Sequence, residues 1–425
     1  MPNHFMTSNV TKDSNKTVLV FGGVLFLLFS FLFLYPDFWR LVIGPYHFGL
    51  DFTYPFLDMH GRLAAFDAHR AGIDILHNPN PLDPMRRINV KPTWPLGLSF
   101  LGLGREHLIV AGSLTALGVW GAMVAILRPG RWREVCLLLP ICFSPPVLFG
   151  MERGNDDLVY FLLLSLVPII LNLKTAYRFW MAWALIFLLA PAKYYPGAVF
   201  LVFFLEVKDW RLLVKLLVAG ILFVGAYVGY NYEEILYLKE NVPKPNFLLA
   251  YGGRRTLELW SLPPFVMWLL LAALVLVVVY GLFRRQWPEP TVSLWSRRWF
   301  LLGYSVTVFC FILNSNYDYR LIFVLPMLPC LLELSRNSKR SGLLYYLAVG
   351  LLCILPIAFW SELAAINYAE LTGTPFFLFS RNIKGLLLWG FVFGATVIAT
   401  TILRPNVRDL CGSFLHVKKD SLDNE

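Results

Sequence analysis

Long apolar runs recur along the whole chain and constrain its fold more than any other sequence feature. Hydrophobic residues make up 57% of the 425 residues and charged residues only 15%, against roughly 25% charged residues in a typical soluble protein. A membrane-crossing helix needs about 20 apolar residues. Runs near that length include Thr17–Pro36, Leu108–Leu127, Leu212–Tyr230, Pro263–Phe283, Leu343–Trp360 and Gly385–Leu403. The sequence therefore predicts an all-α polytopic membrane protein.

We expect about twelve spans, because shorter apolar stretches alternate with polar turns between the long runs. Lysine and arginine concentrate in short turns on the side of the N-terminus, so the positive-inside rule places both termini in the cytoplasm. The chain then forms one membrane domain (1–425), with a first extracytoplasmic loop at 37–107 and a cytoplasmic tail at 404–425. The expected spans are approximately 17–36, 108–127, 135–150, 157–173, 179–191, 194–206, 212–230, 263–283, 299–314, 321–334, 342–361 and 384–403.

Charge and cysteine content argue against other classes of protein. The formal net charge is +10, but basic residues in a membrane protein first set its orientation. No basic-aromatic RNA-binding motif occurs, so we expect no nucleic acid partner. The six cysteines are scattered without a CxxC pair, which indicates neither a disulfide framework nor a metal site. The first apolar run lacks the small-x-small exit of a cleaved signal, so we expect it to remain as a span.

The first outer loop is the longest polar segment of the chain. From Phe56 to Ala71 its apolar residues recur at helical spacing, which predicts an amphipathic helix lying in the membrane interface. Gly72 can end this helix. Five other outer segments offer polar residues toward the same surface, which indicates a site there: Met151–Asp157, Pro191–Tyr195, Asn231–Leu262, Asn314–Arg320 and Ser361–Ile383.

Three stretches resemble a known enzyme family. The first is Asp51-Phe52 after the first span, followed by a helix that ends in Ala71-Gly72-Ile73-Asp74. The second is the return to the membrane, VKPTWPLGLSFLGL, and the third is APAKYYPGAVFLVFFL, at Val90–Leu103 and Ala190–Leu205. In these stretches the chain resembles the GT-C class of integral membrane glycosyltransferases, and most of all glycosyltransferase family 87, the polyprenyl-phosphate-mannose-dependent type.

The resemblance implies a GT-C-like bundle with an active site on the non-cytoplasmic face, in a bacterial cytoplasmic membrane. It also implies a polyprenyl-phosphate-linked hexose donor, such as mannose, a lipid or glycan acceptor, and a catalytic aspartate in the first outer loop, where Asp51 matches by position. Membrane lipids are the remaining expected partners. One departure is clear: the family's mannosyltransferases offer a histidine in a late loop, and this chain has none between His107 and His416.

The expected chemistry assigns roles to the charged residues. An inverting transfer needs a carboxylate that takes the proton of the acceptor hydroxyl, and cations that stabilise the departing phosphate. Asp51 is the predicted base, and Asp58, seven residues on, is the second candidate. Lysine and arginine suffice for a monophosphate, so no metal or other cofactor is expected. The predicted contacts to donor phosphate and sugar are Lys91, Glu152, Arg153, Asn155, Lys193, Tyr194, Asn316, Asp318 and Arg320.

Several of these residues have simpler interpretations. Asn155 can cap the next helix, with two acids in its first turn. Lys193 at a membrane boundary can simply extend to the surface, and Arg320 with Asp318 can form a structural ion pair. For the whole chain, a transporter or flippase of a lipid-linked saccharide is the main alternative, and it would favour paired repeats and charges at mid-span. A non-enzymatic membrane scaffold is a third possibility.

Overall fold

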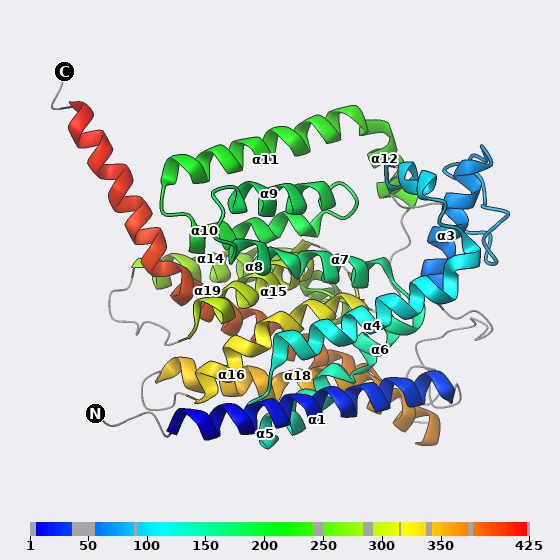
Figure 1. Ribbon diagram of the computed structural model, residues 1–425, viewed down its shortest axis with the longest axis horizontal. Coiled ribbons are helices and arrows are strands. Elements are labelled where there is room, and N and C mark those ends of the chain that lie inside the picture. Colours follow the sequence, from blue (N-terminus) through cyan, green and yellow to red (C-terminus); the bar gives the residue numbers. More distant parts are fainter. Residues whose placement is uncertain are drawn as a thin grey trace.

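The computed structural model describes residues 6–35, 56–88, 92, 94–241, 250–283, 292–313, 316–336, 342–372 and 377–422, and this part of the chain is mainly helical. The helices of the bundle run broadly along one direction, and α3 and α12 lie together at one end of it (Figure 1). We call this the α3 end. At the opposite end, α1 begins and α19 finishes.

Six helices contain segments long and apolar enough to cross a membrane, which confirms the prediction of an all-α polytopic membrane protein. Two further helices, α5 (Trp132–Cys142) and α6 (Pro145–Arg153), meet at 54° and together provide a seventh such segment. The predicted number of twelve is not confirmed. The six helices are α1 (Met6–Leu34), α4 (Leu108–Leu127), α11 (Trp210–Tyr230), α14 (Phe265–Phe283), α18 (Leu343–Thr372) and α19 (Phe377–Leu422).

The other five predicted spans form shorter or less apolar helices, for physical reasons visible in the sequence. Prolines interrupt the region 321–334, which divides into a 3-10 helix with Pro326 inside it and a short α-helix that carries Pro329 in its first turn. Broken helices are tolerated at membrane depth where protein covers them. The elements concerned are α7 (Asp156–Leu164), α8 (Leu166–Leu171), α9 (Arg178–Leu189), η4 (Tyr195–Val202), α10 (Phe203–Glu206), α15 (Leu294–Leu313), η6 (Asp318–Met327) and α16 (Leu328–Arg336).

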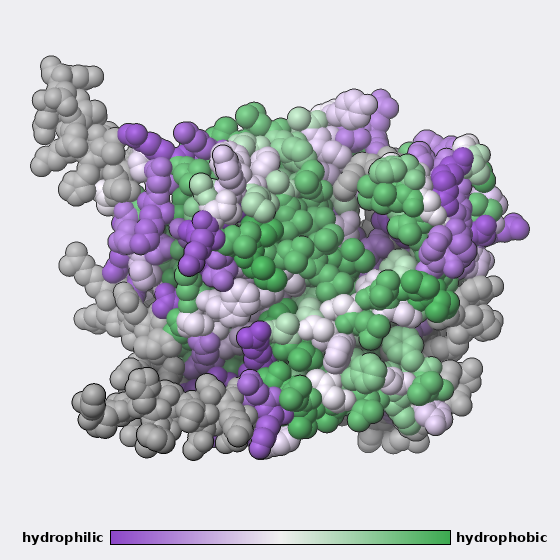
Figure 2. Space-filling model, in the orientation of Figure 1, coloured by the Kyte–Doolittle hydropathy of each residue, from purple (hydrophilic) through white to green (hydrophobic). Residues whose placement is uncertain are grey.

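The centre of the bundle is the contact between α15 and η6. Most side chains of both elements are buried. Their backbones approach closely at Gly303, where a Cβ would lie 2.6 Å from the carbonyl oxygen of Phe323. On the face seen in Figure 2, apolar residues cover the middle of the molecule and hydrophilic residues gather toward its two ends. This distribution is the one expected of a bundle whose middle lies in hydrocarbon.

The predicted amphipathic helix is present as α3 (Leu57–Arg70) and ends before Gly72, which adopts a φ of +69°. Its apolar side packs against protein: the ring of Phe56 fills the space beside Gly112, where a Cβ would lie 2.2 Å from that ring. Phe56, Met59, Leu63, Phe66, Ile75 and Leu96 belong to one small core. The chain returns to α4 through two 3-10 helices, η2 (Trp94–Leu101) and η3 (Arg105–His107).

A two-stranded antiparallel ribbon joins two of the predicted outer segments. β1 (Ala250–Tyr251) pairs with β2 (Asn316–Tyr317), and Tyr251 lies opposite Asn316. This ribbon fixes the backbone just before η6. The nearby elements are α12 (Tyr232–Asn241) and α13 (Gly253–Leu259), and the predicted tail continues α19 as helix to Leu422.

Candidate active site at the α3 end

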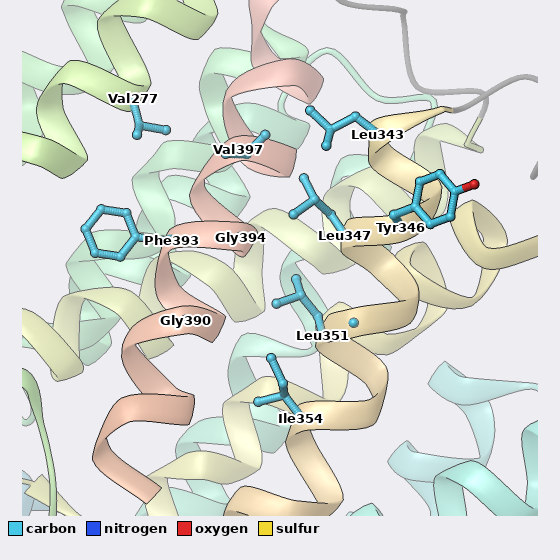
Figure 3. A pocket seen from close by; sticks show the side chains of 11 residues that line it. Val277, Leu343, Tyr346, Leu347, Leu351, Ile354, Gly390, Phe393, Gly394 and Val397 are labelled. Atoms are coloured by element: carbon cyan, nitrogen blue, oxygen red, sulfur yellow. The ribbon is translucent and has the colours of Figure 1, made fainter. Parts of the chain in front are cut away.

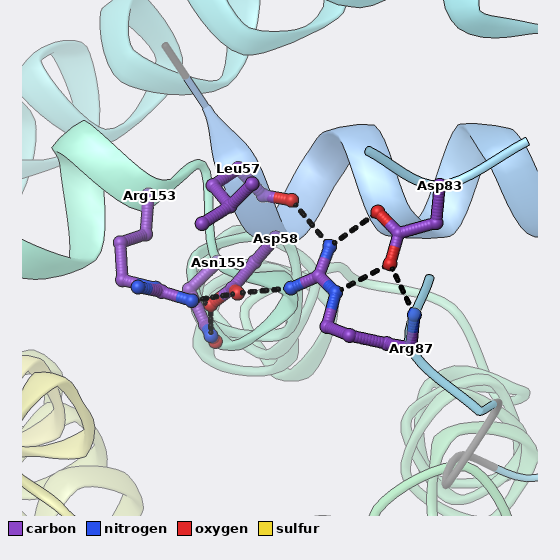
Figure 4. A network of polar contacts seen from close by, with 6 residues as sticks. All are labelled: Leu57, Asp58, Asp83, Arg87, Arg153 and Asn155. Carbon is purple, nitrogen blue, oxygen red and sulfur yellow. Dashed lines mark hydrogen bonds and ion pairs between the residues drawn. The ribbon is translucent and has the colours of Figure 1, made fainter. Parts of the chain in front are cut away.

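Asp58 lies in the first turn of α3, where it is held by three side chains (Figure 4). Arg153 donates to both carboxylate oxygens, from Nη2 at 2.6 Å and from Nε at 3.0 Å. The amide nitrogen of Asn155 donates at 2.6 Å, and Nη1 of Arg87 contacts Oδ1 at 3.4 Å. The carboxylate therefore already accepts from four N–H groups, which makes it a poor proton acceptor. This arrangement suits Asp58 to holding α3 in place.

Asn155 performs two roles at once. Its Oδ1 accepts from the backbone N–H of Asp157 at 2.9 Å and so caps α7, as the simpler interpretation of this residue predicted. Its Nδ2 donates to Asp58. Gly154, with a φ of +55°, turns the chain between α6 and α7 and leaves room for Phe56 and Met59. Glu152 joins the same contact through its backbone, because its carbonyl accepts from the N–H of Phe56 at 3.0 Å.

Asp157 is the most enclosed acid of the site, with no exposed side-chain surface. Lys193 lies 3.0 Å from Oδ1, Nε of Arg320 lies 3.1 Å from Oδ2, and the hydroxyl of Tyr195 donates to Oδ1 at 2.6 Å. Burial alone would raise the pKa of Asp157. The charges of Lys193 and Arg320 lower this pKa by more than burial raises it, so the net pKa lies below its ordinary value. Asp157 is therefore a carboxylate shared by two cations.

The two cations reach the surface of the site. The side chains of Lys193 and Arg320 are 15% and 12% exposed. Nη1 of Arg320 also donates to the hydroxyl of Tyr194 at 3.2 Å and to Oδ1 of Asn316. Tyr194 is about half exposed. With one carboxylate for two cations, this cluster keeps an excess positive charge where a ligand anion can approach.

Asp318 does not pair with Arg320, so the predicted structural ion pair between them is wrong. Residues two apart in a 3-10 helix point in different directions, because that helix has three residues per turn. Instead, Nζ of Lys384 contacts Oδ2 of Asp318 and lies 2.6 Å from Oε2 of Glu362. All three side chains are at most 6% exposed. Asp318 is thus buried between η6, α18 and α19, away from the exposed cations.

Several of the predicted site residues lie together in the structure. The structure brings together Asp58, Glu152, Arg153 and Asn155 in one group, and Lys193, Tyr194, Asn316 and Arg320 in another. Asp51 and Lys91 lie outside the described residues. Asp157, Lys384 and Glu362 were not among the predicted site residues, and Asp157 was interpreted only as a first-turn acid that favours the helix dipole. Glu362 and Lys384 stand at the ends of two predicted spans, and charges at such positions were the available signal.

Other features of the described structure have fewer groups that could bind a ligand or catalyse a reaction. An apolar groove of about 440 Å³ lies between α14, α18 and α19. Its lining, which includes Leu347, Ile354, Gly390 and Gly394, carries no charged side chain (Figure 3). Within the described part of the chain, no three His, Cys, Asp or Glu residues are grouped closely enough to hold a metal ion. The polar groups at the α3 end are therefore the candidate site. No family model, no curated protein and no solved structure matches this chain.

Proposed function

We propose that the protein is a membrane glycosyltransferase that moves a hexose, mannose in the first instance, from a polyprenyl-phosphate donor to a lipid or glycan acceptor on the non-cytoplasmic face. The observation that supports it is the group formed by Lys193, Arg320 and Asp157. Two cations share one carboxylate and both are partly exposed. A departing lipid phosphate is an anion that such N–H groups stabilise.

In this proposal the donor phosphate binds to Lys193 and Arg320. The sugar then lies near Tyr194 and Asn316, whose polar atoms are 3.2 Å apart and flank the guanidinium of Arg320. Asp51 remains the proposed base, since the four N–H groups around Asp58 leave that carboxylate little capacity to take a proton. Asp58 then keeps α3 against the ends of α6 and α7.

The test is transfer of labelled mannose from polyprenyl-phosphate mannose by the purified full chain in nanodiscs. We expect Lys193→Gln and Arg320→Gln to lower turnover by at least 100-fold, and Asp51→Asn to abolish it. The matched control is Arg254→Gln, because Arg254 is exposed and pairs with Glu258 on its own helix at 3.1 Å. Turnover that survives Arg320→Gln in a folded protein contradicts the phosphate assignment.

A second function, transport of a lipid-linked saccharide, is favoured by one observation. Lys384, Asp318 and Glu362 form a buried charged group between three elements of the bundle. Buried ionisable groups of this kind mark ion and substrate pathways in many transporters. Movement of the labelled donor across a proteoliposome membrane, without sugar transfer and sensitive to Lys384→Met, would support the transporter and contradict the transferase.

A further inference from the structure

Asp318, the first residue of η6, is a buried acid that is held through one of its two oxygens. Its side chain is 1% exposed, and Oδ2 accepts from Nζ of Lys384 on α19. Its other oxygen, Oδ1, is buried and has no hydrogen-bond partner within the described part of the chain. Nζ of Lys384 also lies 2.6 Å from Oε2 of Glu362 on α18. The contact with Lys384 therefore ties the start of η6 to both α18 and α19.

Net stability is a poor explanation for this buried ion pair. Removing two charges from water is costly, and apolar residues of similar volume often stabilise a protein as well as a buried pair does. The buried Oδ1 of Asp318 adds the cost of an acceptor without a donor. An ion pair that fixes the position of a neighbouring residue is a better explanation, because charged partners meet in only one arrangement.

The start of η6 depends on such a contact because its local supports are weak. Tyr317 precedes the helix and makes no capping hydrogen bond to it with its side chain. Hydrogen-bond geometry in a 3-10 helix is poorer than in an α-helix. The ribbon before η6 pairs Tyr317 with Ala250 and Asn316 with Tyr251 and extends no further. A contact from outside η6 is therefore needed to fix its first turn.

Arg320 belongs to the same turn and points in a different direction from Asp318. Its Nε donates to Asp157 of α7 at 3.1 Å, and its Nη1 donates to the hydroxyl of Tyr194 at 3.2 Å. Both distances are near the upper limit of about 3.2 Å for N–H···O hydrogen bonds, so a small shift of η6 is enough to break them. The position of Arg320 beside Asp157 is therefore sensitive to the position of this turn.

The start of α19 also supports the other strand of the ribbon. β1 leads into α13, where Gly253 lies so close to α19 that a Cβ would be 2.6 Å from the ring of Trp389. Lys384 and Trp389 belong to neighbouring turns of α19. Both strands of the ribbon are thus followed by elements that contact this part of α19. Asn316 of β2 accepts from Nη1 of Arg320, so the same support holds a side-chain partner of the arginine.

We propose that Asp318 is a positioning residue for the phosphate-binding group around Arg320. Its ion pair with Lys384 fixes the first turn of η6 and so keeps Arg320 beside Asp157, while Asp318 itself does not touch the substrate. The proposal rests on the proposed function, because it takes the donor phosphate as the ligand of Arg320. It also gives the buried charges a role in sugar transfer that needs no movement of ions through the bundle.

The test begins with variants of Asp318 that leave Lys384 paired with Glu362. Asp318→Ala removes the link to Lys384, and Asp318→Leu removes it with an apolar side chain that leaves no cavity. Asp318→Asn is the conservative variant, because its amide oxygen can still accept from Lys384. The matched control is Glu206→Ala, since Glu206 is likewise a buried acid paired with a cation of another element, at the end opposite α3. Binding of inorganic phosphate to each full-length variant in nanodiscs is measured together with its unfolding free energy.

We expect Asp318→Ala and Asp318→Leu to weaken phosphate binding about tenfold, which is within the range of couplings between residues that share one network. Asp318→Asn should retain most of the affinity, and Glu206→Ala should retain all of it. The same variants are then made in Arg320→Gln. If Asp318 acts through Arg320, its substitution has little further effect there, because the two changes are not additive.

Two outcomes of the binding measurement overturn the proposal. The first is an affinity for phosphate that neither Asp318→Ala nor Asp318→Leu changes in the folded protein. The second is an equal fold-loss in the parent and in Arg320→Gln, which shows that Asp318 acts independently of the arginine. In either case a fall in unfolding free energy alone assigns Asp318 to stability.

Turnover with labelled polyprenyl-phosphate mannose separates failure of this proposal from failure of the proposed function. We expect Asp318→Ala to raise the KM of the donor and to leave the KM of the acceptor unchanged. Sugar transfer with an unchanged donor KM in Asp318→Ala contradicts the positioning role alone. Absence of transfer by the parent, with the dependence of phosphate binding on Asp318 and Arg320 preserved, contradicts the transferase alone.

Discussion

The two ends of the bundle use ion pairs in different ways. At the end opposite α3, Arg298 donates to both oxygens of Glu206 at 2.7 and 2.9 Å, and Arg336 donates to both oxygens of Glu134 at 2.7 and 2.6 Å. Each of these pairs matches one guanidinium with one carboxylate. At the α3 end the acids are shared: Asp157 contacts Lys193 and Arg320, and Asp58 and Asp67 each contact two arginines.

This difference indicates that the ion pairs at one end mainly stabilise the bundle, whereas those at the α3 end can also bind a ligand. A bidentate pair satisfies both partners and leaves little for a ligand. A shared carboxylate leaves cationic N–H groups that are held in place but only partly neutralised. We infer that the opposite end serves mainly to join α10 to α15 and α5 to α16, and that the α3 end combines joining with recognition.

Removing one partner of a closed pair should give the largest loss of stability. Arg298→Ala leaves Glu206 buried without its partner, and breaking a buried ion pair in this way costs about 3–5 kcal/mol. We expect Arg298→Met/Glu206→Leu to recover most of that loss, because it leaves no buried charge. Unfolding of the purified protein in mixed micelles measures both effects. A single variant as stable as the parent contradicts a structural role for this pair.

At the α3 end, the corresponding change should affect activity more than stability. Arg320→Gln removes one of two cations beside Asp157, while Lys193 and Tyr195 still contact the acid. We expect a loss of transition-state stabilisation of about 3 kcal/mol, seen as the 100-fold fall in turnover, with a smaller change in unfolding free energy than in Arg298→Ala. The comparison fails if the stability effects at the two ends are equal.

A backbone change at the junction of α6 and α7 should have an intermediate effect. Gly154→Ala places a Cβ at a φ of +55°, where its distance to the Cβ of Phe56 would be 2.9 Å. The left-handed conformation alone costs about 1–2 kcal/mol for a residue with a side chain. We expect this loss in the unfolding free energy, together with weaker docking of α3 measured by hydrogen exchange. Gly121→Ala, where the space is open, is the control.

The smallest effect should be the pH dependence of the loop. Burial raises the pKa of Asp67, but its hydrogen bonds and the charge of Arg105 lower it more, so its folded pKa lies below the ordinary value of 3.8. Since the folded pKa is depressed, the stabilisation is present above pH 3.8 and is lost as pH falls through the folded pKa. Hydrogen exchange of α3 should rise in that acid range in the parent and not in Asp67→Asn.

Local patterns in the sequence predicted much of the fold. The apolar spacing from Phe56 to Ala71 and the glycine after it were sufficient for α3, because an amphipathic helix carries its own periodicity. The six long runs were equally clear. The central elements were predicted less well, since a short buried helix and a membrane span have the same apolar composition. Pro326 and Pro329 were present in the sequence, but their effect depends on the packing of η6 against α15.

The sequence could not predict which residues far apart along the chain would contact each other. The polar turns at 151–157, 191–195 and 314–320 were selected because charges between apolar runs are conspicuous, and Asp157, Lys193 and Arg320 from these turns do contact one another. Which acid meets which cation depends on how the helices pack: Asp157 and Arg320 are far apart in sequence, and Lys384 belongs to a run interpreted as a plain span.

Asn155 shows how a single side chain can narrow the choice of residue at a helix start. Such positions ordinarily accept Asn, Asp, Ser or Thr almost interchangeably, because each offers an oxygen to the first turn. Here the nitrogen of the same side chain faces Asp58 at 2.6 Å. An aspartate would bring two like charges together, and a hydroxyl would be too short to serve both neighbours. The exchange of one NH₂ group for an oxygen, nearly neutral at most caps, would here set two carboxylates against each other and weaken the attachment of α3 to the start of α7.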